Sequence, residues 1–127
     1  PMVLEAHGRG RRVYPTGDTY DGDWEGGVPH GFGSMRYASG DGYSGDWERG
    51  KPTGEGAYAY ASGDVYRGAM VDTERQGTGK CSYADGSEYE GGWLHGVWHS
   101  AGAPSKLRTA AGDAYEGRFV HGELRGR

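Results

Sequence analysis

The stretch Gly17-Asp18-Thr19-Tyr20-Asp21-Gly22-Asp23-Trp24 decides how the chain folds, because most of the remaining sequence repeats it. It is followed by Gly27 and by the pair Gly31 and Gly33. The pattern returns every 23 residues, and a last copy arrives three residues late; the copies begin at Gly40, Gly63, Gly86 and Gly112. A fixed period in the twenties indicates a repeat architecture. We therefore expect one repeat array over residues 1–127, made of a half repeat (7–16), four repeats (17–39, 40–62, 63–85 and 86–111) and an incomplete final repeat (112–127).

Glycine and polar residues dominate the composition, which by itself is typical of a disordered chain. The 127 residues include 27 glycines, and the mean hydropathy is -0.86. All but three of these glycines fall on repeat positions, however, and nine of the ten tyrosines are also in phase. Disordered chains do not keep such a register. The sequence therefore predicts a folded array whose units bury apolar surface against their neighbours.

Charge and cysteine content exclude several classes of function. The formal net charge of -4 and the pI near 5.7 argue against nucleic-acid binding, which requires clustered lysine and arginine. Cys81 is the only cysteine, so we expect no intramolecular disulfide and no thiolate metal cluster. No run of about 18 apolar residues is present that would span a bilayer, and no signal peptide is recognised. Because residues 7–14 match the second half of a repeat and Gly126 opens another, we expect a segment of a longer array.

Alternation of side chains within each unit predicts β-strands. Tyr20, Gly22 and Trp24 share one face of an extended strand, and the acidic residues between them take the other face. On a helix this spacing would scatter the rings around the axis, and each glycine would cost about 1 kcal/mol relative to alanine. Turn residues at 26–30 and 38–41 separate the alternating segments. We therefore expect an all-β fold, a single-layer antiparallel sheet of tandem hairpins with about ten strands and a length on the order of 50 Å.

Glycines inside the strands need an explanation, because glycine weakens a strand unless another group must come close. We expect large aromatic rings from neighbouring strands to lie over these glycines, which are Gly22, Gly45, Gly68, Gly91 and Gly117. The rings would then cover one face of the sheet without a second layer. Aromatic cross-strand pairs contribute roughly 0.2–1 kcal/mol each, so stability would come from repetition.

The pattern G-(D/S)-x-Y-x-G-x-W-x-x-G-x-x-x-G-x-G, clearest at 17–33 and 40–56, resembles the MORN repeat from His7 to Arg127. The resemblance implies an elongated, twisted antiparallel sheet of hairpins. It also implies a non-catalytic scaffold and protein-interaction module at cytoskeletal or membrane-associated structures inside the cell, with phospholipid binding proposed for the family. The departures from the pattern are Met70 and Phe119 at tryptophan positions, Thr73 and Ser100 at glycine positions, and the insertion before Gly112.

The aromatic track is the main candidate site, either as a groove that holds a protein partner or as the structural core of the sheet. Aromatic side chains are common anchors at interfaces, but a one-layer sheet also needs rings to cover its own face. The core role has the greater weight for any single ring. The track comprises Tyr20, Trp24, Tyr43, Trp47, Tyr66, Met70, Tyr89, Trp93, Tyr115 and Phe119.

The C-terminal half carries a candidate surface for self-association. The first repeats have an acid at the end of the strand, and the later repeats have an apolar residue at that position. The fourth unit also has an extra tryptophan and a three-residue insertion. Irregular units of an array are often caps or contact points, and open edge strands add strands from other chains. We therefore expect a homodimer through residues 86–127, and the candidate contacts are Val71, Leu94, Trp98 and Val120.

The remaining reactive groups fit structural roles better than chemistry. The histidines near turns, His30, His95, His99 and His121, form no closed ligand set, so we expect no metal and no cofactor. The acids Asp21, Asp23, Glu25, Asp46 and Glu48 recur with the array, as a solvated strand face does, whereas a catalytic pair would be unique. No nucleophile motif is present, and we expect no enzyme. The basic ends, Arg9, Arg11, Arg12, Arg125 and Arg127, would make weak contact with anionic lipid, at about 1 kcal/mol per residue.

Two alternatives stay open. A ligand-binding repeat would hold choline, a sugar or a lipid headgroup on its aromatic track through cation–π and stacking contacts. Choline-binding repeats, however, lack the paired G-x-G that recurs here. In the other alternative, the array is the targeting or regulatory region of a larger enzyme. For all of these we expect an intracellular location: cytoplasmic, cytoskeletal or at the membrane periphery.

Overall fold

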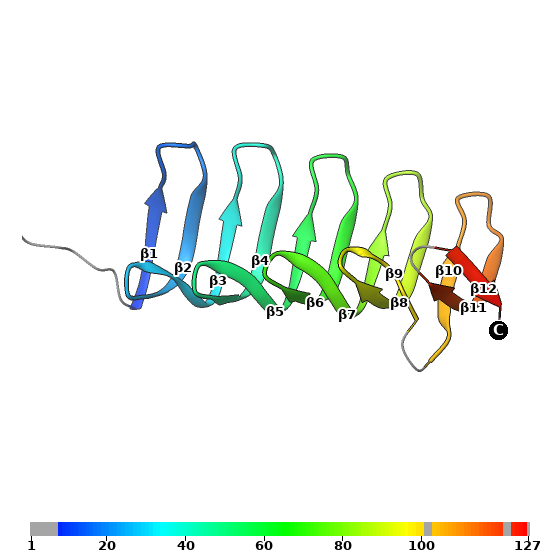
Figure 1. The fold of residues 1–127 in the computed structure, drawn as a ribbon. Coiled ribbons are helices and arrows are strands. Elements are labelled where there is room, and N and C mark those ends of the chain that lie inside the picture. Colours follow the sequence, from blue (N-terminus) through cyan, green and yellow to red (C-terminus); the bar gives the residue numbers. More distant parts are fainter. Residues whose placement is uncertain (1–7, 101–102, 121–122, 127) are drawn as a thin grey trace, which may run out of the picture.

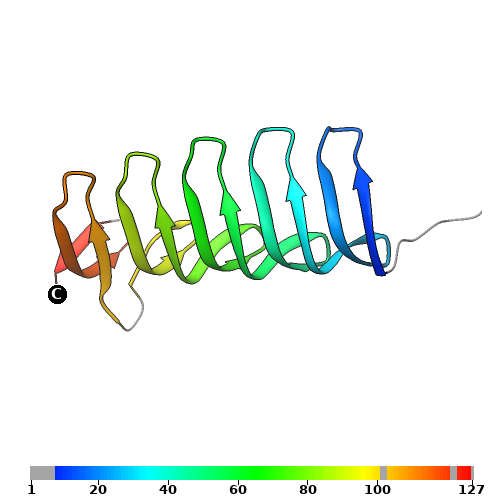
Figure 2. The same cartoon turned by 180° about the vertical axis from the view of Figure 1, so that it is seen from behind.

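The computed structural model describes residues 8–100, 103–120 and 123–126. These residues form one open, helix-free antiparallel sheet whose hairpins stand side by side along a single axis (Figure 1). The strands are β1 (Gly8–Val13), β2 (Thr19–Glu25), β3 (Val28–Arg36), β4 (Gly42–Glu48), β5 (Lys51–Ala59), β6 (Val65–Val71), β7 (Glu74–Ser82), β8 (Glu88–Leu94), β9 (Val97–Trp98), β10 (Ser105–Arg108), β11 (Ala114–Val120) and β12 (Glu123–Gly126). Strands adjacent in sequence are adjacent in the sheet, except that β9 lies off this path and pairs with β8. The same row of hairpins is seen from behind in Figure 2. The all-β sheet of tandem hairpins expected from the sequence is confirmed.

Glycines form a continuous ladder across the middle of the sheet. Gly22 lies opposite Gly10 on one side and opposite Gly33 on the other, and the series continues from strand to strand. The ladder comprises Gly10, Gly22, Gly33, Gly45, Gly56, Gly68, Gly79 and Gly91. On β10, Ser105 takes the place of glycine and faces Gly117. The ladder takes one glycine from each of the strands β1 to β8. It therefore crosses the sheet as a line that is almost free of side chains.

Each tyrosine that precedes a ladder glycine leans onto the following strand. A Cβ added at Gly33 would collide with the ring of Tyr20, and Gly56 and Gly79 stand in the same relation to Tyr43 and Tyr66. The reason is geometric, because the glycine is the diagonal neighbour of the tyrosine across the strand pair and lies within reach of a long side chain.

This arrangement corrects the expectation that rings lie over the glycines of the first strand of each hairpin. A Cβ at Gly22, Gly45 or Gly68 would strike the Cα of the paired glycine, and one at Gly91 would strike the side chain of Ser105. These glycines allow the two backbones to approach closely. The glycines of the second strand make room for the rings.

Both rims of the sheet are hydrogen-bonded from one hairpin to the next. Along the loop rim, Asp18 accepts the backbone N–H of Ala38 at 2.8 Å. The same bond recurs from Ala61 to Asp41 at 2.7 Å and from Ala84 to Asp64 at 2.8 Å. Along the turn rim, the carbonyl of Pro29 accepts the N–H of Gly50 at 2.9 Å, and equivalent bonds join Thr73 to Pro52 and Gly96 to Arg75. Asp18, Asp41 and Asp64 therefore each tie their own loop to the next.

The irregular fourth unit keeps its place in the sheet through serine hydroxyls. Ser100, at a glycine position, donates its N–H to the Phe119 carbonyl at 2.7 Å, and its hydroxyl accepts the Phe119 N–H at 3.0 Å. Ser105 is fully buried and accepts the Tyr89 hydroxyl at 2.8 Å. The insertion is thereby absorbed while β10 still pairs with β8 over three residues and with β11 over four. His121, Arg127 and the side chain of Arg125 lie outside the described residues.

Candidate interaction surfaces

The aromatic track forms the core of the sheet, in which tryptophans and tyrosines alternate edge to face. Trp47 packs between Tyr20, with ring centroids 5.2 Å apart, and Tyr43, at 5.3 Å. Trp93 packs in the same way between Tyr66 and Tyr89, at 5.3 and 5.1 Å. Such T-shaped pairs place the positive edge of one ring on the negative face of the next. The rings thus form two runs along the array, and the buried Met70 stands at the tryptophan position between them.

The two residues at variant tryptophan positions also enter this core. Met70 is 1% exposed, and Phe119 is equally buried, with its ring 5.3 Å from that of Tyr89. Tyr115 differs, because its side chain is 47% exposed. The residues of β12 pair with β11 only from Arg118 to Val120, so in the described structure no strand lies beside Tyr115 on its outer side.

The polar atoms of the core rings have backbone partners. The hydroxyl of Tyr20 donates to the carbonyl of Asp23 at 2.8 Å, at the point where the β2–β3 register shifts. The indole N–H of Trp24 donates to the carbonyl of Gly10 at 2.9 Å. The tyrosine bond recurs at Tyr43, Tyr66 and Tyr89, and the tryptophan bond recurs at Trp47 and Trp93. The tyrosine of the Tyr-x-Gly-x-Trp spacing therefore satisfies a carbonyl at the bulge, and the tryptophan satisfies the carbonyl of a ladder glycine on the preceding strand.

Burial also changes the acidity of these hydroxyls. Desolvation, with a smaller contribution from the nearby acid, raises the pKa of Tyr20 and of Tyr43 to about 12. Tyr20 is 0% exposed and Trp47 is 3% exposed. In this conformation these rings contact one another and the glycine ladder instead of lining an open groove.

Three further core residues were not among the expected site residues. Met35, Tyr58 and Cys81 are buried in the row between the tyrosines, where they lie opposite Tyr43 and Tyr66 or their equivalents. They occupy one repeat position, two residues after a ladder glycine, and strand alternation would have assigned them to the buried face. Burial raises the pKa of the Cys81 thiol, so this cysteine is a packing residue.

Arg75 is a second residue that sequence reasoning missed. It stands where earlier units have Pro29 and Pro52, and its guanidinium lies 4.7 Å from the ring centroid of Trp93 and 5.5 Å from that of Tyr60. Its Nη2 donates to the carbonyl of Gly96 at 2.8 Å. A cation over these two rings covers the aromatic face beside Met70, where a tryptophan is missing.

The outward face of the sheet carries the residues that alternate with the core. Two of its acids have structural contacts: Asp23 accepts the N–H of Phe32 at 3.1 Å, and Asp46 accepts that of Glu55 at 3.0 Å. Asp23 also pairs with Arg9 at 3.1 Å. The recurrence of these acids therefore reflects bonds to the bulged strand as well as solvation.

The four residues expected to mediate self-association occupy two environments. Val71 is 43% exposed at the end of β6, and Leu94 and Val120 are partly exposed at the ends of β8 and β11. We name these three the apolar margin. Trp98 instead joins the core, where its ring stacks on Tyr89 at 4.7 Å and 4° and its N–H donates to the Tyr83 hydroxyl at 2.7 Å. Val97, beside Leu94, is a further exposed apolar residue.

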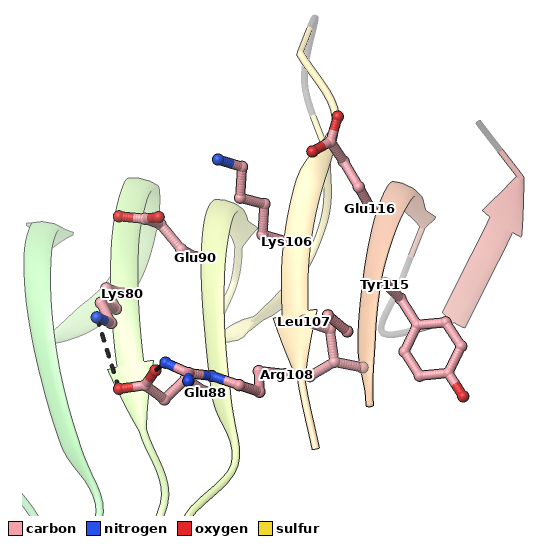
Figure 3. A pocket seen from close by; sticks show the side chains of 9 residues that line it. Lys80, Glu88, Glu90, Lys106, Leu107, Arg108, Tyr115 and Glu116 are labelled. Carbon is pink, nitrogen blue, oxygen red and sulfur yellow. Dashed lines mark hydrogen bonds and ion pairs between the residues drawn. The ribbon is translucent and has the colours of Figure 1, made fainter. Parts of the chain in front are cut away.

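An open hollow of about 530 Å³ lies on the outward face over β7, β8, β10 and β11 (Figure 3). Charged side chains line it: Lys80, Glu88, Glu90, Lys106, Arg108 and Glu116. Glu88 accepts ion pairs from Arg108 at 2.7 Å and from Lys80 at 3.5 Å. The bond from Arg108, followed by the charge of Lys80, lowers the pKa of Glu88. This hollow has mixed charge and no bias toward anionic or cationic ligands.

Comparison with known families identifies the array. The model of the MORN repeat matches four consecutive segments, at residues 5–19, 20–42, 43–65 and 66–88. This chain belongs to the MORN repeat family. MORN repeats are generally non-catalytic modules that interact with proteins or membranes, and proteins that contain them are generally intracellular and membrane-associated. A search of curated proteins gives no match to the chain.

The described part of this MORN array offers neither a metal site nor a membrane-spanning helix. Over residues 8–100, 103–120 and 123–126, no three histidine, cysteine or acidic side chains come together as metal ligands would. The same part of the chain contains no helix with the length and apolar character needed to cross a membrane.

Proposed function

We propose that this MORN array is a non-catalytic scaffold that binds other proteins and a second copy of itself, at cytoskeletal or membrane-peripheral structures in the parent protein. The observation that supports the proposal is the difference between the two faces of a single-layer sheet. Rings with 0–6% exposure cover one face, while the other face is open along all the hairpins. A surface that is long, rigid and free of a covering layer suits the docking of other chains.

Self-association is assigned to the C-terminal repeats because the apolar margin lies there on the outward face. Val71 and Leu94 replace Glu25 and Glu48, which occupy the same repeat position in the first two units. Apolar residues that project from strand ends beside a charged surface are typical of contacts between subunits. Binding of choline or a sugar receives less support, because the rings that would cage such a ligand are buried in one another.

Contact with anionic lipid is a weaker part of the proposal, carried by the basic residues of β1. Two of these residues have contacts inside the sheet: Arg9 pairs with Asp23, and the guanidinium of Arg12 lies 4.3 Å from the centroid of the Tyr14 ring. Co-sedimentation with vesicles that contain phosphatidylserine tests this contact. Equal recovery with purely zwitterionic vesicles would remove lipid from the proposed function.

The experiment that tests self-association is sedimentation velocity on the double variant Val71→Glu/Leu94→Glu. Glutamate is the natural residue at this position in earlier repeats, so the variant is expected to fold. We expect the unvaried chain to dimerise at tens of micromolar and the variant to remain monomeric. The matched control is Val28→Glu, a change at an equally exposed valine (40%) near the other end of the array. A monomeric unvaried chain, or a double variant that dimerises as the control does, would contradict the proposal.

A further inference from the structure

Residues on the outward face form two cross-strand rows over β7, β8, β10 and β11, and six of the eight residues are charged. The first row, in cross-strand register, is Lys80, Glu90, Lys106 and Glu116. The second row is Ser82, Glu88, Arg108 and Ala114. Neighbouring strands are about 4.8 Å apart, so the first row extends over roughly 14 Å. Along it the charge changes sign at every strand.

Three of the four charged residues of the first row form no short ion pair in the described part of the chain. Glu88, in the second row, accepts both Lys80 and Arg108. In contrast, Glu90, Lys106 and Glu116 have no ion pair within 4.0 Å in the described part of the chain. Figure 3 shows these three side chains projecting from neighbouring strands at the hollow. Their charges are therefore available to a partner.

Both rows are self-complementary under one two-fold rotation. An axis parallel to the strands, between β8 and β10, reverses the order of the strands in the second copy. Glu90 then faces Lys106 of the other copy, and Lys80 faces Glu116. The same axis brings Glu88 opposite Arg108 in the second row. An axis centred on β8 would instead oppose Lys80 and Lys106, and one centred on β10 would oppose Glu90 and Glu116.

We propose that this charged face is the contact between two antiparallel copies of the chain, related by the axis between β8 and β10. The inference rests on the self-association proposed above and adds its geometry. Cross-strand pairing within one chain also favours alternating signs, but a second copy turned about this line meets an opposite charge at every charged position of both rows. Charge complementarity of this kind fixes register and orientation more than it adds affinity. Leu94 and Val120 end strands of the same face, so the apolar margin borders this contact.

The test uses two single charge reversals, Glu90→Lys and Lys106→Glu, in sedimentation velocity at low salt. In either homodimer the reversed residue would face a like charge at two symmetry-related contacts, so we expect the Kd to rise about tenfold or more. An equimolar mixture of the two variants restores opposite charges at both contacts. We therefore expect the mixture to dimerise with a Kd close to that of the unvaried chain.

The control is Glu55→Lys, which makes the same charge change on the outward face outside the two rows and is expected to leave dimerisation unchanged. Thermal unfolding of each variant alone establishes that it folds. If the unvaried chain stays monomeric at low salt, both the proposed self-association and this inference are overturned. If dimerisation occurs but neither reversal weakens it, or if the mixture does not restore it, only the inference is overturned.

Discussion

Replacement of Gly56 by alanine tests whether the ladder glycines exist to admit tyrosine rings. The backbone of Gly56 lies outside the left-handed region, so alanine causes no strain in φ. The added Cβ, however, would overlap the ring and hydroxyl of Tyr43, which would have to move. A moved ring would lose its bond to the carbonyl of Asp46 (2.9 Å) and its edge contact with Trp47 (5.3 Å).

The expected loss follows from these contacts. A partly buried carbonyl left without its donor costs about 1 kcal/mol or more, the aromatic pair contributes about 0.5–1.5 kcal/mol, and overpacking costs about 1–3 kcal/mol. Because the terms overlap, we expect Gly56→Ala to lower the free energy of unfolding by about 3–5 kcal/mol. In a chain of this size that corresponds to a fall in Tm of roughly 10–20 °C.

The assay is guanidinium and thermal unfolding, followed by tryptophan fluorescence and circular dichroism. Gly10→Ala is the matched control, because Gly10 has the same repeat position but its Cβ would meet only Trp24, at an ordinary 3.4 Å. We expect this control to change stability by less than about 1 kcal/mol. A double-mutant cycle with Tyr43→Ala isolates the clash, because Gly56→Ala should cost little once the ring is gone. Equal losses for Gly56→Ala and Gly10→Ala would refute the reasoning.

Two further predictions concern the loop rim and the buried hydroxyls. Asp41→Ala removes the acceptor of the Ala61 N–H (2.7 Å) and of the Tyr58 hydroxyl (3.2 Å), so we expect a loss of about 1–2 kcal/mol in denaturant unfolding. Asp113→Ala is its control, because Asp113 has the same motif position but its carboxylate holds no later loop in the described structure; equal losses would show that the loop-to-loop bond is not the cause. For pH, the pKa of Tyr20 and Tyr43 is raised from 10.0 to about 12 by burial. Their neutral form therefore stabilises the fold fully below pH 10.0, and this contribution is lost as pH rises toward about 12. Tyrosinate absorbance and circular dichroism should change together over that range, and early ionisation of all ten tyrosines without unfolding would contradict the burial.

Several features of the fold follow directly from the repeat. The spacing of Tyr20, Gly22 and Trp24 places them on one strand face, and the glycine-rich turns divide the chain into hairpins. Periodicity also indicates which positions are equivalent, so that residues at one repeat position share one environment. The same rule would have identified Met35, Tyr58 and Cys81 as core residues, had the position two residues after the second G-x-G glycine been followed through all the units.

Other features depend on contacts between strands and could not be read from spacing. The sequence places Tyr20 and Gly22 on the same strand. Diagonal packing across the strand pair, however, puts the ring of Tyr20 over Gly33, while Gly22 faces the backbone of Gly33. Trp98 looked like a surface residue because it breaks the repeat, yet it stacks on Tyr89. Arg75 gave no signal, because its role depends on the ring of Trp93 on β8 and on that of Tyr60, just after β5.

The sequence by itself determined the all-β array, its hairpin spacing and its aromatic track, because each of these depends on the order of residues along one strand or turn. The tertiary structure decided that the rings bury one another, that hydroxyl and indole groups donate to backbone carbonyls, and that charges on β8, β10 and β11 line up in rows. These features depend on cross-strand register. A three-residue insertion before β10 shifts the repeat pattern along the sequence by three residues. The hydrogen bonds of Ser100 and Ser105 nevertheless keep β10 in register with its neighbours.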